Sequence, residues 1–346
     1  MNKLHSIILL SALLLLSGCK NAVSDNQPKN EPDPAVNNSH IVVAYIVSWS
    51  SVMPDCSLMS HLNYAFGHVN NSFNGIRIDE PQRLRAISAA KGDVKLCLSV
   101  GGWGSGGFSE MAMSEENRLA FAADCSRVID EYALDGIDID WEYPTSSAAE
   151  ISSSPEDTRN FTLLMKDIRA AIGPDKLLTL ASVNSAEYID FASVVPVVDW
   201  VNVMAYDMGN PPRHNAALFN STHSSYSADK AVHAHLRAGV PKDKLVLGMP
   251  FYGHGDGKSY DAFLDYRDLT PPLPGHSEEW DDVAKVPFYA DADGHLVLSF
   301  DNPRSIAEKC RYIIDQDLLG GMYWEYTTDN SAHELARTVA GLLLEE

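Results

Sequence analysis

The sequence predicts an α/β fold, a TIM (β/α)8 barrel with a small α+β insertion between the seventh strand and its helix. Short apolar runs rich in β-branched residues alternate with longer stretches of helical period. The alternation recurs about eight times over roughly 300 residues, as in barrels of this kind. The chain has 346 residues, 45% of them hydrophobic, which is enough for one large domain. An open doubly wound sheet is the alternative fold.

Eight segments have the composition of buried strands. Each is short, apolar and rich in β-branched or aromatic residues, which fit a sheet well. Helical segments separate most of them, which favours parallel pairing, because a parallel connection needs a long crossover. The predicted strands cover residues 41–49, 61–69, 95–102, 136–142, 176–183, 199–207, 244–253 and 320–326.

Six segments have helical periodicity. Ser114 precedes the second and has Asn117 three residues on, an N-cap with an imperfect capping box. Ser154 and Pro155 begin the third, and Gly173 ends it. The helical signal after the first strand is weak. The predicted helices cover residues 81–92, 114–134, 154–173, 227–239, 302–318 and 331–346.

One segment interrupts the alternation after the seventh strand. Residues 254–301 contain several prolines and the stretch KVPFYADADGHLVLSF, which predicts a small strand-containing insertion. We expect it on the face where barrels build their sites. The glycine-rich stretch at 101–107 lacks the lysine of a phosphate-binding loop and the spacing of a dinucleotide fold, and no cofactor is expected.

The N-terminus is predicted to lie outside the barrel. Residues 1–18 form a signal peptide, because the apolar run Ile7–Leu16 is too short to span a bilayer. Residues 19–39 are polar and rich in Asn, Pro, Asp and Ser, which indicates a flexible tether. Residues 40–346 form the barrel domain.

Leu-Ser-Gly-Cys at the end of the signal peptide resembles the lipobox of bacterial lipoproteins. The resemblance implies that Cys19 becomes a lipidated first residue; an ordinary secretory signal is the alternative. Lys20 follows, in place of the Asp that commonly retains such proteins at the inner membrane. We therefore expect a lipid-anchored protein of the cell envelope, in the outer membrane.

The charge of the chain bears on its binding partners, and the spacing of its cysteines bears on metal binding and disulfides. The chain has 47 acidic and 26 basic residues and a formal net charge of −21, which argues against nucleic acid and suits a neutral or cationic substrate; plain solubility also accounts for it. Cys56, Cys97, Cys125 and Cys310 lack any metal or redox spacing, and we expect buried free thiols. A monomer is expected.

The stretch DGIDIDWEYP, residues 135–144, interleaves acidic and apolar residues. On a strand, Asp138, Asp140 and Glu142 share one face, opposite the side chains at 137, 139 and 141. Three carboxyl groups on one buried face cannot all ionise, so at least one proton is retained near neutral pH. Glu142 lies nearest the barrel mouth, where it would act as a general acid. A metal site is the alternative, but calcium loops need an irregular backbone.

Five motifs together resemble family 18 of the glycoside hydrolases, the chitinases and their relatives. DGIDIDWEYP matches the family signature D-x-x-D-x-D-x-E. The resemblance covers the chain from about residue 40 onward and implies a TIM barrel. The other motifs are SVGGW (99–103), MAYD (204–207), GMPFYG (248–253) and MYWEY (322–326).

The resemblance implies retaining cleavage of β-1,4 bonds after N-acetylglucosamine, with the substrate's own acetamide oxygen as nucleophile. It makes Glu142 the acid and later the base, and Asp140 the partner of the acetamide N–H. Asp138 would share a proton with Asp140. Tyr206 would donate its hydroxyl to the acetamide oxygen, and Asp207 would bind a sugar hydroxyl.

Aromatic and apolar positions complete the implied site. Trp324 would form the floor beneath the central sugar, Trp103 would stack beyond the cleavage point, and Tyr143 would add a hydrogen-bonding group. Trp49, Trp200 and Trp280 are interpreted as packing residues. Further candidate substrate contacts are Met204, Tyr45 and Phe66, the last two with an ordinary core position as the alternative.

Two departures from the family pattern affect the predicted substrate. Chitinases of the family often carry Arg after the seventh strand, where this chain has His254, and many have a longer insertion. A shallower groove is therefore expected. A chitinase or chitooligosaccharide hydrolase is the first hypothesis, and an endo-β-N-acetylglucosaminidase that cuts N-glycan cores is the second. A lectin is a third, although lectins on this barrel typically lack the acid that Glu142 provides.

Overall fold

The computed structural model describes residues 40–344, so the predicted signal peptide, Cys19 and the tether lie outside the described residues. Eight parallel strands form a closed barrel, because β1 pairs with β2 on one side and with β14 on the other. This confirms the predicted fold class. The barrel strands are β1 (Ile41–Val47), β2 (His61–Val69), β4 (Lys95–Gly101), β5 (Gly136–Asp140), β6 (Leu177–Val183), β7 (Trp200–Met204), β8 (Leu245–Pro250) and β14 (Gly320–Trp324).

The helices follow the prediction closely, apart from the start of one helix and two additional short helices. The third predicted helix begins at Asp157 rather than Ser154, because the Asp157 side chain accepts the N–H of Ser154 and holds it in a loop. Only the short 3-10 helix η1 (Cys56–Leu58) lies between β1 and β2. Two short helices, α2 and α5, were not predicted. The α-helices are α1 (Pro81–Ala90), α2 (Phe108–Met113), α3 (Glu115–Tyr132), α4 (Asp157–Ile172), α5 (Phe191–Val194), α6 (Ala228–Arg237), α7 (Pro303–Asp315) and α8 (Glu334–Leu343).

The strands have two buried faces, as the alternation in DGIDIDWEYP predicts. Ile137, Ile139 and Trp141 belong to the core between the strands and the helices, where the Trp141 ring stacks on Phe108 at 5.3 Å. A second apolar cluster, which includes Tyr45, fills the barrel interior. The inward carboxylates therefore lie among apolar side chains rather than in water.

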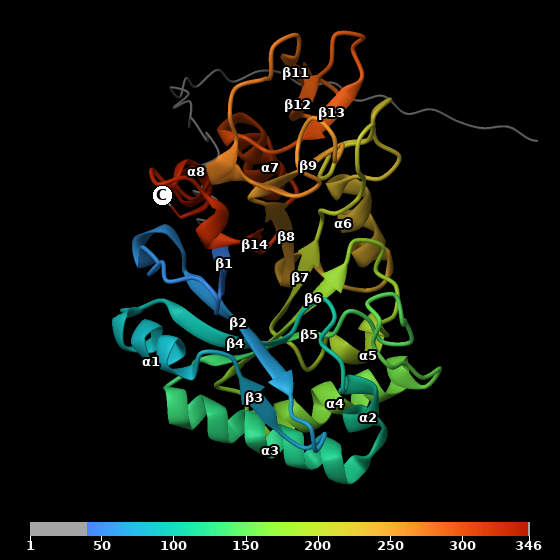
Figure 1. Cartoon of the computed structure of the whole chain (residues 1–346). Helices are drawn as coiled ribbons and strands as arrows, with labels where there is room; N and C mark the ends of the chain where they lie inside the picture. The colour runs from blue at the N-terminus through green and yellow to red at the C-terminus, as the bar shows by residue number, and fades with distance from the viewer. Residues whose placement is uncertain (1–39, 345–346) are drawn as a thin grey trace, which may run out of the picture. The chain divides into compact units, whose positions relative to one another are not determined.

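The insertion is a five-stranded antiparallel sheet. Its order is β10-β9-β13-β12-β11, and Figure 1 shows β11, β12 and β13 gathered at one end of the molecule, away from α3 and α4. This confirms a strand-containing insertion after the seventh barrel strand. A short strand β3 (Ile76–Ile78) also pairs with β2 and was not predicted. The insertion strands are β9 (Tyr252–Gly255), β10 (Leu264–Asp265), β11 (Ser277–Asp281), β12 (Val286–Ala290) and β13 (Leu296–Ser299).

The described cysteines are free, and none is in a disulfide. Cys97, Cys125 and Cys310 are buried and Cys56 is partly buried, which agrees with the expected free thiols. Burial raises the pKa of the Cys310 thiol to about 12, so it stays protonated. Between residues 40 and 344 no helix combines the length and the apolar character needed to cross a bilayer.

Candidate active site

Asp138 is fully buried inside the barrel and accepts hydrogen bonds from side chains of four other barrel strands. Its carboxylate accepts hydrogen bonds from the hydroxyls of Tyr45 (2.8 Å), Ser99 (2.8 Å) and Thr179 (2.6 Å), and from Nδ2 of Asn202 (3.2 Å). Burial raises the pKa of Asp138, and these four bonds oppose the rise. Asp138 therefore organises the site from beneath the pocket and is not part of its lining.

Asp140 is the last residue of β5 and lines the pocket. Its Oδ1 is buried and has no hydrogen-bond partner among residues 40–344, and no bond within that range joins it to Asp138. Burial, followed by the charges of Glu142 and Asp138, raises its pKa well above the usual range. These effects favour the protonated form of Asp140, and its unpartnered oxygen is available to a donor on the substrate. The proton shared with Asp138 stays a prediction.

Glu142 lies two residues beyond the end of β5, at the mouth of the barrel, rather than within the predicted strand. Burial raises its pKa to about 7, the charge of Asp207 adds to the rise, and a hydrogen bond from Tyr143 opposes it. A carboxylic acid that keeps its proton to about neutral pH can donate it to a leaving group. Glu142 therefore has the chemistry expected of the predicted acid.

The two glycines of SVGGW let β4 approach β5 beside this acid. Gly101 has a φ of 132°, and a Cβ there would lie 1.9 Å from the main-chain oxygen of Asp140. Gly102 donates its N–H to that same oxygen at 2.8 Å, and a Cβ there would meet the ring of Phe66 at 2.7 Å. Glycine is required at both positions because any side chain would displace the residues that form the pocket.

The pocket has a volume of about 610 Å³ and an aromatic floor. The ring of Trp324 stacks on Phe66, with centroids 5.6 Å apart and planes 22° apart, and packs at a tilt on Tyr45. Tyr45 and Phe66 therefore line the pocket and are also largely buried, and their contact with the substrate stays a prediction. An aromatic floor of this kind suits the apolar face of a sugar ring.

Trp103 and Tyr143 both line the pocket, and their predicted contacts with a sugar stay predictions. Their rings meet edge to face at 6.3 Å, and Tyr143 stacks on Tyr188 at 5.3 Å. Trp103 is 63% exposed although its ring is large and apolar. An exposed indole at the rim of a pocket is available for stacking against a ligand.

Further lining residues come from the end of β7 and the two positions after it. Met204 and Tyr206 lie in the pocket lining and are largely buried, and the Tyr206 hydroxyl faces Sδ of Met322 at 3.9 Å. Burial and then the charge of Asp140 raise the pKa of Tyr206 well above its usual value, so its hydroxyl stays a donor. Gly248 on β8 makes room for this ring, because a Cβ there would lie 3.0 Å from it.

Asp207 follows at the rim, with its side chain 58% exposed. One oxygen, Oδ1, accepts the Tyr252 hydroxyl at 2.7 Å and lies 3.1 Å from Nε2 of His254, whose Nδ1 lies 3.2 Å from the carbonyl oxygen of Gly209. The His254 ring thus takes a polar position beside the acidic pocket. Sequence reasoning noted His254 only as a departure from the family pattern.

Trp49 was interpreted as a packing residue, and the structure corrects this. β1 ends at Val47, so Trp49 leaves the sheet and stands 69% exposed at the pocket rim. Together with Phe263 of the insertion and Trp324, it also lines a neighbouring cavity of about 440 Å³. Trp200 is buried, as expected.

Trp280 is also a packing residue, half-buried beneath the guanidinium of Arg304, whose Cζ lies 3.7 Å from the ring centroid.

Within residues 40–344, one group of three side chains could hold a metal ion: Asp291, Asp293 and His295. These residues lie at the turn between β12 and β13 of the insertion, and the pocket does not include them.

A closed parallel barrel whose pocket holds a buried carboxyl group with a raised pKa beside several aromatic rings is typical of glycoside hydrolases of the TIM-barrel class. The chain belongs to the glycosyl hydrolases family 18, whose sequence model matches residues 41–329. This confirms the predicted family.

Known relatives agree with this assignment. Chitinase A1 of Niallia circulans is 33% identical over 313 residues, which are 75% of this chain and 45% of that protein, so the chain spans less than half of that relative. Chitinase B of Serratia marcescens is 26% identical over 89% of this chain and 80% of its own length. A solved family 18 N-acetylglucosaminidase from Paenibacillus barengoltzii superimposes with a TM-score of 0.78 at 32% identity, covering 88% of this chain and 100% of its own.

Proposed function

We propose that this enzyme hydrolyses β-1,4 bonds after N-acetylglucosamine in chitin or chitooligosaccharides, with retention and with the substrate's acetamide group as nucleophile. The observation that carries the proposal is the raised pKa of Glu142, about 7, in the same pocket as the unpartnered oxygen of Asp140 and the Tyr206 hydroxyl. The names of Chitinase A1 and Chitinase B among the relatives support this substrate class.

In the proposed reaction, Glu142 donates its proton to the oxygen of the leaving sugar as the glycosidic bond breaks. The acetamide oxygen bonds to the anomeric carbon and forms an oxazolinium ion. Asp140 accepts the acetamide N–H, and Tyr206 donates its hydroxyl to the acetamide oxygen. The Glu142 carboxylate then takes a proton from water, whose oxygen bonds to the anomeric carbon as the bond between that carbon and the acetamide oxygen breaks, which restores the acetamide.

The carboxyl groups of the protein are poorly placed to act as the nucleophile. The carboxylate of Asp138 already accepts four hydrogen bonds, and burial with the charges of Glu142 and Asp138 raises the pKa of Asp140, which disfavours its nucleophilic carboxylate form. Oδ1 of Asp207 is occupied by the Tyr252 hydroxyl and faces His254. A nucleophile supplied by the substrate accounts for this arrangement and would restrict the enzyme to N-acetylated sugars.

Exposed aromatic rings on both sides of the Trp324 floor support a substrate of several sugars. Trp103 stands at one side of the pocket, and Trp49 and Phe263 stand between the pocket and the adjoining cavity. Sugar rings stack on such surfaces without charge pairing. We therefore propose chain-internal cleavage of oligosaccharides rather than action on single terminal sugars.

A second candidate function is that of an endo-β-N-acetylglucosaminidase acting on N-glycan cores. The solved relative from Paenibacillus barengoltzii, which this chain covers completely, is described as an N-acetylglucosaminidase, and this observation keeps the second candidate open. Both functions use the same acid and the same acetamide chemistry. Product analysis with chitooligosaccharides and N-glycoproteins as parallel substrates separates them.

The Glu142→Gln variant tests the proposed mechanism. Because glutamine cannot donate a proton to the leaving oxygen, we expect kcat to fall by about 10²–10⁴-fold while binding of the oligosaccharide persists. Turnover of chitooligosaccharides and their binding by calorimetry are measured in parallel. Wild-type turnover by the variant would remove Glu142 from the mechanism.

We also propose that the enzyme is held at the cell envelope, in the outer membrane, through a lipid on Cys19. The supporting observation is the lipobox-like sequence that ends at this cysteine, followed by Lys20. Fractionation of cells that produce the Cys19→Ala variant provides the test. Retention of that variant in the membrane fraction would contradict the anchor.

A further inference from the structure

The loop between β7 and α6 holds Asp207 in an uncommon backbone conformation. Its φ is 55°, in the left-handed region that residues with a Cβ rarely adopt. The residue must be held there by its surroundings, because the same chain would otherwise relax toward a common conformation. The hydrogen bonds around Asp207 identify what holds it.

Asn215 holds the main chain at this point with both of its oxygens. Its Oδ1 accepts the N–H of Asp207 at 2.8 Å, and its carbonyl oxygen accepts the N–H of Met208 at 3.0 Å. Asn215 is fully buried, so water does not compete for these bonds. The orientation of its amide is fixed, because only oxygen can accept the N–H of Asp207.

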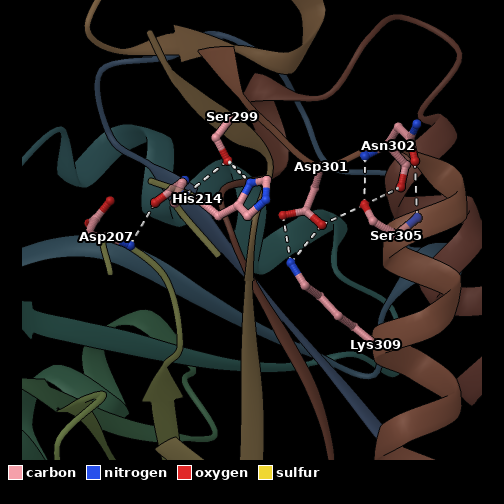
Figure 2. A network of polar contacts seen from close by, with 8 residues as sticks. Asp207, His214, Ser299, Asp301, Asn302, Ser305 and Lys309 are labelled. Carbon is pink, nitrogen blue, oxygen red and sulfur yellow. Dashed lines mark hydrogen bonds and ion pairs between the residues drawn. The ribbon is translucent and has the colours of Figure 1, made fainter. Parts of the chain in front are cut away.

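Ser299 of the insertion holds Asn215 in turn. The Ser299 Oγ accepts the N–H of Asn215 at 3.0 Å and lies 3.3 Å from Nδ1 of His214. Figure 2 shows Ser299 beside His214, with dashed lines that lead on to Asp207. Ser299 and His214 are each 1% exposed, so the chain of contacts is closed to solvent.

The remaining contacts define the direction of each hydrogen bond. Nε2 of His214 lies 3.2 Å from Oδ2 of Asp281, so Nε2 carries the proton and Nδ1 is free to accept the Ser299 hydroxyl. Burial lowers the pKa of His214 to about 4, which keeps the ring neutral at working pH. Burial acts against ionisation of Asp281, but hydrogen bonds from Ala284, Ser221 and His214 outweigh it and lower its pKa.

The same sheet also holds the side chain of Asp207. Ser299 on β13 pairs directly opposite His254 on β9, and directly opposed residues of an antiparallel pair share one face. His254 and its near neighbour Tyr252 contact Oδ1 of Asp207. The paired residues His254 and Ser299 of the insertion sheet therefore act on Asp207 in two ways. His254 contacts its carboxylate directly, and Ser299 holds its main chain through Asn215.

We propose that Asn215 and Ser299 are positioning residues, through which the insertion sheet holds the Asp207 carboxylate at the pocket. The inference rests on the proposed function, in which the other oxygen of Asp207 binds a sugar hydroxyl. The charge of Asp207 also helps to keep the proton on Glu142. The insertion thus contributes to the reaction from outside the barrel, although neither Ser299 nor Asn215 contacts the substrate in this proposal.

A double-mutant cycle between Ser299→Ala and Asp207→Asn tests this proposal. Alone, Ser299→Ala should lower kcat/KM by about tenfold, mainly through KM, because Asp207 is no longer held in place. It should also shift the alkaline limb of the pH profile to lower pH, because the Asp207 charge is less well held near Glu142. In the Asp207→Asn background, the same substitution should have little further effect.

Ser305→Ala is the matched control. Ser305 is equally buried, and its hydroxyl donates to Asp301 and caps α7, but it makes no bond to Asp207 or Asn215 among the described residues. We expect this control to lower the unfolding temperature while KM and the pH limb stay at wild-type values. Equal effects of Ser299→Ala in both backgrounds, or a wild-type KM and pH limb, would overturn the proposal.

If Ser299→Ala does not fold, the cycle is run with Asn215→Ala, which keeps the main-chain N–H to Ser299 and removes the side-chain amide, including the Oδ1 that accepts the N–H of Asp207. The same outcomes then decide. The cycle is measured on whichever substrate the wild-type enzyme cleaves, a chitooligosaccharide or an N-glycoprotein. A wrong substrate assignment therefore shows in the wild-type enzyme alone, whereas a wrong positioning role shows only in the comparison of variants.

Discussion

At the scale of single residues, Glu142 depends on Asp207 for part of its raised pKa. Burial contributes most, and the Asp207 charge adds to it. The free enzyme should therefore lose kcat/KM as pH rises through about 7, where Glu142 gives up the proton that it must donate. A neutral residue at 207 removes the second contribution and should lower the pKa of Glu142.

We predict that Asp207→Asn shifts this alkaline limb to lower pH and raises KM. The reason is that asparagine carries no charge to stabilise the protonated acid, and it binds a sugar hydroxyl less strongly than a carboxylate does. The pH dependence of kcat/KM on a soluble chitooligosaccharide is the measurement. A limb that stays at the wild-type pH would show that burial alone sets the pKa of Glu142.

Some residues of the site can be predicted from a local motif, whereas others can be identified only from the folded structure. Asp140, Glu142 and Tyr206 could be predicted because each belongs to a short motif that lies at the end of a strand, near the mouth of the barrel. Asn215 and Ser299 are 84 positions apart, and a sequence pattern does not show that they meet. Trp49 was misinterpreted because the end of β1 at Val47 decides its exposure, and strand ends are poorly defined by composition.

At the scale of elements, α7 docks through a buried ion pair. Nζ of Lys309 lies 2.6 and 2.7 Å from the two carboxylate oxygens of Asp301, with both side chains almost fully buried (Figure 2). Burial lowers the pKa of Lys309, and the charge of Asp301 opposes this. Such a pair fixes the position of a helix, because either charge alone is strongly disfavoured in this environment.

We predict that Lys309→Met destabilises the fold by about 3–5 kcal/mol, because Asp301 is left buried without a counter-charge. Chemical denaturation measures the free energy of unfolding. Arg311→Ala is the control on the same helix, since Arg311 makes an exposed pair with Glu308 and should cost less than about 1 kcal/mol. Equal losses in the two variants would show that the Lys309 pair contributes nothing specific.

Most elements could be predicted because their periodicity is local. All eight barrel strands were located, whereas α2 and α5 were missed because helices of six and four residues complete too few turns to show a period. The order of the insertion sheet was also out of reach, because β9 pairs with β13 across more than 40 residues. Local pattern thus predicts the barrel, and long-range pairing determines how the insertion meets Asp207.

At the scale of the whole molecule, the chain carries a net charge of −21. The raised pKa values of Asp140 and Glu142 favour their protonated forms, so the attraction of cations to the cleft comes from the field of the whole protein and from Asp207 at the rim. Such a field raises the local concentration of ligands of the opposite sign. Chitooligosaccharides with some free amines should therefore bind better than fully acetylated ones when the amines are protonated.

We predict that partially deacetylated oligosaccharides have a KM that rises with salt, whereas fully acetylated oligosaccharides of equal length have a nearly constant KM. The reason is screening: the Debye length falls from about 30 Å at 0.01 M salt to about 3 Å at 1 M. One sugar must stay acetylated for the proposed chemistry, so substrates with a defined acetylation pattern are compared at mildly acidic pH. Parallel salt curves for the two substrates would contradict an electrostatic role for the cleft and leave aromatic stacking as the basis of recognition.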